Sequence, residues 1–134
     1  MLHERASIKR HQGDSLRDLL SILAGSNRFY APRIAASLSN IETVTTEQFC
    51  SHFQMTTKQE IVDDQAAHPP FGTNLTYPMS AYTRVSQTSG TSGQAIRWLD
   101  TPASWNWMVD CWTTVFERSS VNANDRIFFA FSSS

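Results

Sequence analysis

The sequence predicts an α/β fold in which N-terminal helices are followed by a β-hairpin, one further helix and a buried strand. Leucines recur at helical spacing over residues 16–23, and apolar residues do so again over 105–116. Between these segments, two runs of alternating side chains flank a stretch rich in Ser, Thr and Gly. The last run, residues 127–131, is apolar throughout, which is typical of a strand buried on both faces. A chain of 134 residues suits one domain with a modest core.

The first helices follow from the signals at their ends. Residues 1–13 are polar and indicate a solvated, partly disordered leader. Asp14 or Ser15 can cap a first helix, and Gly25 ends it. Asn27 can cap a second helix, whose inward-facing residues are expected to be Phe29, Tyr30, Ile34 and Ala35.

Two shorter helices are expected before the hairpin. Thr46 can cap the first of them. Thr56, with Gln59 three residues later, has the capping-box pattern for the second. That second helix ends at His68, because Pro69 disfavours the α conformation in the residue before it.

The hairpin is expected over residues 82–99, and its glycine-containing connection is longer than a tight turn. Thr101 can then cap a helix with Pro102 at its first position, and this helix runs to about residue 118. Its apolar side chains share one stripe, which predicts packing into the core: Trp105, Met108, Val109, Trp112, Val115 and Phe116. A turn at 121–125 leads into the buried strand.

The connection between the two strands holds the residues on which we expect the chemistry to depend. It places glycines among hydroxyl side chains: Thr88, Ser89, Gly90, Thr91, Ser92 and Gly93. Because glycine permits positive φ, successive backbone N–H groups can point into one concavity, and the hydroxyls add donors at its rim. Such a concavity favours a polyphosphate. The spacing fits neither a Walker A loop nor a nucleophile elbow, and a flexible turn without a ligand is the alternative.

Lys58 is a second candidate for contact with an anion. It lies in the first turn of the helix that follows Thr56, where a cation is slightly unfavourable against the helix dipole. That misfit leaves two alternatives open, namely a specific ion pair or anion contact, or a lysine that is merely solvated.

Composition excludes several classes of function. The 11 basic and 12 acidic side chains give a net charge of −1, so no basic excess indicates a nucleic-acid partner. No stretch approaches the roughly 20 apolar residues of a membrane span. Cys50 and Cys111 lack a metal-type spacing and are too few for a disulfide scaffold, which favours a reduced, cytoplasmic setting. We expect no metal ligands in this chain.

Residues 88–93 resemble the phosphate-loop signature of the adenylate-forming superfamily, which includes the acyl-CoA synthetases. Three further segments resemble motifs of its phenylacetate-CoA ligase-like branch: Asn27-Arg28-Phe29-Tyr30, Thr56-Thr57-Lys58, and Arg84 shortly before the loop. The order and approximate spacing match over about residues 16–131. One departure is visible, since many members follow the loop with Gly-x-Pro and this chain has Gly93-Gln94-Ala95.

This resemblance implies that the chain is an incomplete part of the large N-terminal domain of such an enzyme. Residues 1–13 are then a polar leader, 14–80 an N-terminal helical region, and 81–134 the start of the AMP-binding domain. In that family, the adenine-binding segment and the lysine used in adenylation come later in the chain. The resemblance therefore implies no catalytic residue here, and the chain alone is expected to be inactive.

The function implied is that of an ATP-dependent acid–CoA ligase, which activates a carboxylate as an acyl-adenylate and transfers it to CoA. An aryl acid such as phenylacetate is the implied substrate class, and the full-length enzyme is expected to be cytoplasmic and able to form a homodimer. The loop would hold the phosphates of ATP with Mg²⁺ sharing their charge, and Lys58 and Arg84 would be further anion contacts. The alternative is a small non-catalytic α/β interaction module whose loop binds no nucleotide.

Overall fold

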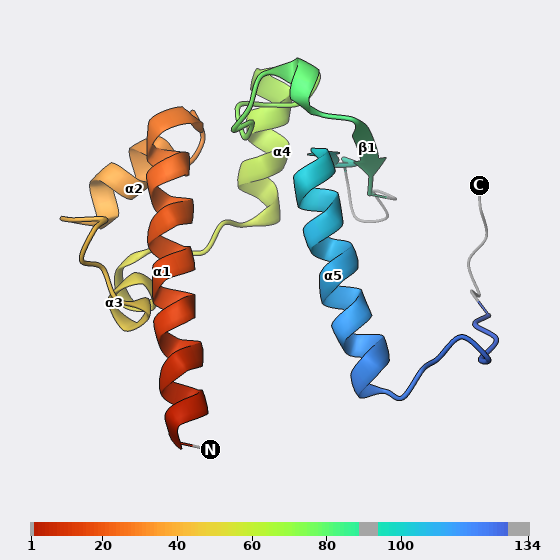
Figure 1. Ribbon diagram of the computed structural model, residues 1–134. Coiled ribbons are helices and arrows are strands. Elements are labelled where there is room, and N and C mark those ends of the chain that lie inside the picture. The colour runs from red at the N-terminus through yellow and green to blue at the C-terminus, as the bar shows by residue number, and fades with distance from the viewer. Residues whose placement is uncertain (1, 89–93, 129–134) are drawn as a thin grey trace.

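The computed structural model describes residues 2–88 and 94–128 and confirms the predicted α/β class. Its elements in chain order are α1 (Leu2–Ser26), α2 (Ala31–Ser37), α3 (Thr46–His52), α4 (Lys58–Ala67), the 3₁₀ turn η1 (Met79–Ala81), β1 (Arg84–Gln87), β2 (Arg97–Asp100) and α5 (Pro102–Arg118). Figure 1 shows α2 and α3 beside the long α1, with α4, the hairpin and α5 further along the chain. Within these described ranges, no helix is long and apolar enough to cross a membrane.

The main core lies where α1 packs against α2 and α3. Leu20, Ile34 and Val44 are buried there, and partly buried leucines and aromatic rings surround them. The rings of Phe49 and Phe53 stack with their centroids 4.9 Å apart. Of the residues expected to turn inward from α2 and the turn before it, Ile34 is buried and Ala35 is exposed, so the prediction for Ala35 is wrong.

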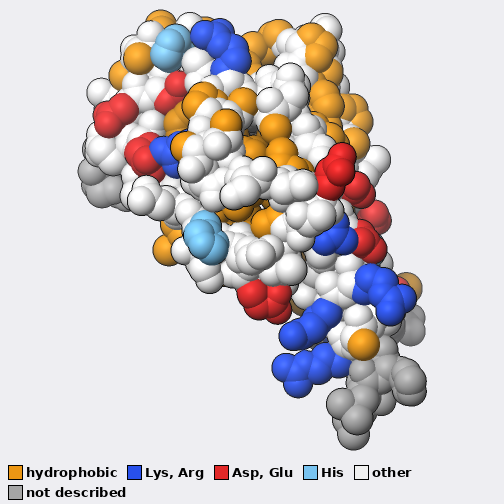
Figure 2. All heavy atoms as spheres, turned by 90° about the vertical axis from the view of Figure 1, so that its left-hand side faces the viewer, with side chains coloured by type: hydrophobic (Ala, Val, Ile, Leu, Met, Phe, Trp, Pro, Cys, Tyr) orange, Lys and Arg blue, Asp and Glu red, His pale blue; other side chains and the backbone are white. Residues whose placement is uncertain are grey.

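Helix α1 begins at Leu2, so the partly disordered leader predicted for residues 1–13 is wrong from residue 2 onward. The segment consists largely of good helix formers such as Arg5, Lys9 and Gln12, and nothing before Gly13 interrupts them. Its side chains over 5–12 are exposed, as expected for a polar segment. Figure 2 shows Lys and Arg side chains gathered at the lower end of the face that includes α1.

The caps of α3 and α4 each lie one residue from their predicted positions. Thr45 caps α3 and Thr57 caps α4, each in a complete capping box. For α4, two adjacent threonines could each be the cap, since Thr56 with Gln59 and Thr57 with Glu60 fit the same pattern. A contact outside the helix decides between them, because the Thr56 hydroxyl pairs with the hydroxyl of Tyr30 at 3.2 Å.

The predicted hairpin is confirmed as an antiparallel pair of β1 and β2. Its register places Arg84 opposite Asp100 and Gln87 opposite Arg97. The ladder continues one pair further, since the N–H of Thr88 donates to the carbonyl of Ile96 at 2.9 Å. Residues 89–93, which form the predicted loop beyond this pair, lie outside the described residues.

Helix α5 has the predicted cap at Thr101 and the predicted end at Arg118, but its apolar stripe is not a core. Val109, Trp112 and Val115 are about half exposed, so their predicted burial is wrong in this chain. A helix buries its apolar stripe only where another element covers it, and α5 packs chiefly against β2.

The predicted buried strand is also absent where it can be observed. Residues 126–128 have no strand assignment, and Phe128 is 89% exposed. A buried strand needs an apolar sequence and a neighbouring strand that pairs with its backbone. The sequence shows the apolar run but does not show whether a neighbouring strand is present. The rest of that prediction, at 129–131, lies outside the described residues.

Gly72 provides a test of this fold. Its φ of +78° disfavours side chains, and an added Cβ would overlap Oδ2 of Asp64. That Oδ2 accepts from the N–H of Thr73, and Oδ1 of the same carboxylate accepts from the Thr73 hydroxyl. We expect Gly72→Ala to lower the free energy of unfolding by about 2 kcal/mol or more. Urea unfolding followed by far-UV circular dichroism measures this change.

Gly25→Ala is the matched control, because a Cβ at Gly25 meets no atom within 4 Å. In helix α1 this change should leave stability unchanged or raise it by up to about 1 kcal/mol. Equal stabilities for the two variants would contradict the conformation described for Gly72.

Candidate functional site

The side-chain amide of Gln65 attaches helix α4 to the hairpin. Its Nε2 donates to the carbonyl of Arg97 at 2.7 Å, and its Oε1 accepts from the N–H of Arg97 at 3.0 Å. The amide therefore occupies the outer edge of β2 as a residue of a third strand would. The Arg97 guanidinium adds a bond to the carbonyl of Pro70 at 3.0 Å, which ties the segment after α4 to the same strand.

This attachment brings the first turn of α4 to the base of the predicted phosphate loop. A groove of about 510 Å³ lies between them and is lined by Tyr30, Thr56, Thr57, Lys58, Ile61, Thr88, Ile96 and Trp98. We call it the α4–hairpin groove. A second hollow beside it is also lined by Lys58 and includes Gln94. Lys58 therefore lies near the residues at both ends of the loop.

Thr88 is the one predicted loop residue within the described part of the chain, and it closes the base of the loop. Its hydroxyl oxygen accepts from the N–H of Ile96 at 2.9 Å, and its own N–H donates to the carbonyl of Ile96. Ile96 is buried, so this paired base is a fixed support. The other predicted loop residues, Ser89, Gly90, Thr91, Ser92 and Gly93, lie outside the described residues.

Lys58 is the first residue of α4 and is exposed. The carboxylate of Glu60 accepts from the N–H of Thr57 at 2.7 Å and from its hydroxyl at 2.9 Å. These bonds and the guanidinium of Arg33 lower the pKa of Glu60 below its usual range. An ionised Glu60 at the start of the helix offsets the unfavourable position of the Lys58 ammonium in the helix dipole.

Arg84, the second predicted anion contact, lies at the far end of β1 from the loop. Four residue steps along the extended strand separate it from Thr88, a distance of about 13 Å. Its guanidinium lies 4.0 Å from the ring centroid of Trp105 on α5. The structure thus brings Lys58 to the base of the loop and holds Arg84 against α5.

Sequence reasoning missed the contribution of the N-terminal helices to this groove. Asn27 is 1% exposed, and its Oδ1 accepts from the N–H groups of Phe29 and Tyr30 at 3.1 and 3.0 Å. Its Nδ2 donates to Asn74 and Thr76, both at 3.0 Å. Asn27 therefore fixes the turn from which Tyr30 reaches the groove. The signal available in the sequence was the Asn-x-Phe-Tyr motif.

The groove does not have the composition of a magnesium site. Its lining residues include hydroxyls and the Lys58 ammonium but no carboxylate, whereas Mg²⁺ in proteins is usually bound through carboxylates. Across residues 2–88 and 94–128, no group of three or more His, Cys, Asp or Glu side chains could hold a metal ion.

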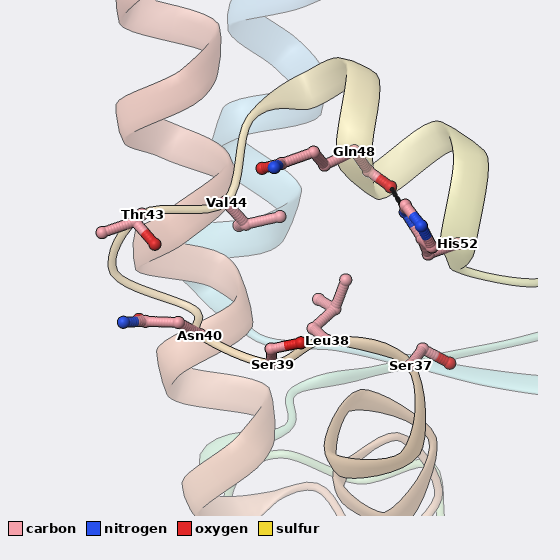
Figure 3. A pocket seen from close by; sticks show the side chains of 8 residues that line it. All are labelled: Ser37, Leu38, Ser39, Asn40, Thr43, Val44, Gln48 and His52. Atoms are coloured by element: carbon pink, nitrogen blue, oxygen red, sulfur yellow. Dashed lines mark hydrogen bonds between the residues drawn. The ribbon is translucent and has the colours of Figure 1, made fainter.

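A smaller pocket of about 160 Å³ lies between the end of α2 and helix α3. Figure 3 shows the residues that line it, including Gln48, whose carbonyl is 2.8 Å from Nδ1 of His52. None of the predicted site residues and no Lys, Arg, Asp or Glu lines this pocket. It is therefore separate from the candidate site.

No protein-family model matches the chain, and no curated protein matches it either. Solved structures of 2-hydroxyisobutyryl-CoA ligase are similar in fold. An open conformation in complex with 2-HIB-AMP and CoA gives a TM-score of 0.69 at 21% identity, covering 79% of this chain and 24% of that one. A second structure, in the thioesterification state with the same ligands, gives 0.70 at 23% identity, covering 79% and 22%.

This chain has the fold of one part of an adenylate-forming CoA ligase. It spans about a quarter of the length of the ligase it matches. The similarity covers most of this chain. It does not distinguish the phenylacetate-CoA ligase-like branch, which stays a prediction from the sequence motifs.

The attachment of α4 predicts a local effect of Gln65→Ala. Each lost hydrogen bond is worth about 0.5–1.5 kcal/mol, so the N–H of Arg97 should exchange with solvent about ten times faster. Hydrogen exchange measured on residues 94–100 tests this expectation. Gln59→Ala is the control, because the Gln59 side chain donates to Asp63 on the same helix. Equal exchange in both variants would contradict the attachment.

Proposed function

We infer that this chain is the N-terminal portion of an ATP-dependent acid–CoA ligase, which activates a carboxylate as an acyl-adenylate and transfers the acyl group to CoA. The observation that carries this inference is the α4–hairpin groove, where Lys58 lies beside the base of a Ser/Thr/Gly loop. Most of this chain shares its fold with one part of a ligase solved with 2-HIB-AMP and CoA.

The role of these residues follows from the charge of ATP. The loop offers backbone N–H groups and hydroxyls but no cationic side chain. Lys58 supplies a positive charge from a separate helix, next to Thr88 at the loop base. When a carboxylate attacks the α-phosphate, negative charge builds up on the departing pyrophosphate, and donors already in place stabilise it. The groove therefore binds and orients the leaving group.

Other parts of the reaction are assigned to the remainder of the enzyme. Magnesium would enter with ATP, since the groove offers hydroxyls and an ammonium group instead of carboxylates. The sequence motifs and the solved ligases suggest two different classes of acid substrate. The motifs at Asn27–Tyr30 and Thr56–Lys58 favour an aryl acid such as phenylacetate, and the name of the solved ligases suggests a short hydroxy acid.

Pyrophosphate release by the full-length enzyme with Mg-ATP, CoA and a panel of aryl, hydroxy and fatty acids tests the function. Lys58→Ala should raise the KM for ATP about tenfold or more, because a hydrogen bond to a charged group is worth about 1.5–3 kcal/mol. Lys58→Arg should retain part of the effect. Lys9→Ala is the control, since Lys9 lies on α1 and pairs with Glu47.

Gly90→Val should abolish ATP binding in the same enzyme, since a β-branched residue resists positive φ and fills the concavity. If the wild-type enzyme releases no pyrophosphate in response to any acid, the proposed function is refuted and the interaction module is favoured. Release that is unaffected by Lys58→Ala would show that the groove does not bind the phosphates.

A further inference from the structure

We propose that Arg33 is a positioning residue for the phosphate site, and that its ion pair with Glu60 holds Lys58 at the base of the loop. This inference rests on the proposed function. Arg33 lies on α2, and its Nη2 pairs with Oε1 of Glu60 on α4. Its Nη1 lies 3.5 Å from the hydroxyl of Thr56. One guanidinium thus contacts the residues on both sides of Lys58.

Both oxygens of the Glu60 carboxylate are engaged. Oε1 accepts from Arg33, and Oε2 accepts from the N–H and hydroxyl of Thr57. The carboxylate therefore joins α2 to the cap of α4. Lys58 lies between Thr57 and Glu60 in the chain, so the same network fixes the backbone from which its ammonium extends.

Arg33 is itself held in place. Its guanidinium lies 4.7 Å from the ring centroid of Phe29, and that ring packs edge-on against Tyr30 at 5.0 Å. Tyr30 lines the α4–hairpin groove and contacts the Thr56 hydroxyl. A planar guanidinium that stacks and pairs at once gives a defined geometry, which a flexible side chain would not supply.

The rest of α4 does not depend on this ion pair. Ile61 is buried, and Gln65 is bonded to the hairpin at the other end of the helix. The side chains of Arg33 and Glu60 are 27% and 40% exposed, and partly exposed pairs contribute little to stability. Removing Arg33 should therefore displace the first turn of α4 while the protein stays folded.

The test uses the full-length enzyme, with the KM for ATP, the KM for the acid, kcat and Tm measured for each variant. Arg33→Met keeps the length of the side chain and removes its charge. It should raise the KM for ATP about tenfold, with the KM for the acid unchanged, because a misplaced cation weakens only the phosphate contact. Arg33→Lys should restore the KM for ATP only in part, because lysine renews the charge opposite Glu60 without the stacked guanidinium over Phe29.

Arg28→Met is the matched control, because Arg28 lies in the neighbouring turn and is exposed. It should leave all four quantities unchanged. If the wild-type enzyme is active and Arg33→Met has the same KM for ATP, this inference alone is overturned. A variant with lower Tm and kcat but an unchanged KM for ATP would also overturn it, since that is the result of a merely structural role. A wild type without acid-dependent pyrophosphate release would overturn the proposed function and this inference together.

Discussion

The hydrogen bonds between the Gln65 amide and the main chain of Arg97 determine where helix α4 lies on the hairpin. A two-stranded hairpin leaves the peptide groups of its outer edges unpaired, and an isolated hairpin is only marginally stable. Gln65 pairs one such edge next to the loop. The same bonds place the first turn of α4 at the loop base, so the groove that contains Lys58 depends on this contact.

The N-terminal helices belong to the site as much as the hairpin does. They provide the groove with Tyr30, and they hold the start of α4 through the Arg33–Glu60 pair. Asn27, buried in the turn between α1 and α2, has its amide donor and acceptor both engaged. A buried amide of this kind is costly to leave unpaired, so it fixes the geometry of its turn. The helical region therefore supports the α4–hairpin groove, which the hairpin alone would not complete.

Local signals in the sequence predicted much of this, and tertiary contacts account for the rest. The hairpin and the bounds of α5 follow from alternation, glycine and the Thr101–Pro102 start. The cap of α4 could not be predicted, since Thr56 and Thr57 offer the same box and only the contact with Tyr30 separates them. Burial of the α5 stripe failed as a prediction because apolar spacing does not reveal whether a covering element is present. Gln65 carried no signal at all, since any exposed helix has polar residues.

The most direct measurement of the central claim is hydrogen exchange of the full-length enzyme with and without a non-hydrolysable Mg-ATP analogue. In the proposed function, the first turn of α4 and the loop of the hairpin are two halves of one phosphate site. Binding should therefore slow exchange in residues 56–61 and in residues 84–99 at the same analogue concentration. Protection confined to the hairpin, or absent from both segments, would contradict the assignment of Lys58 and the loop to a common site.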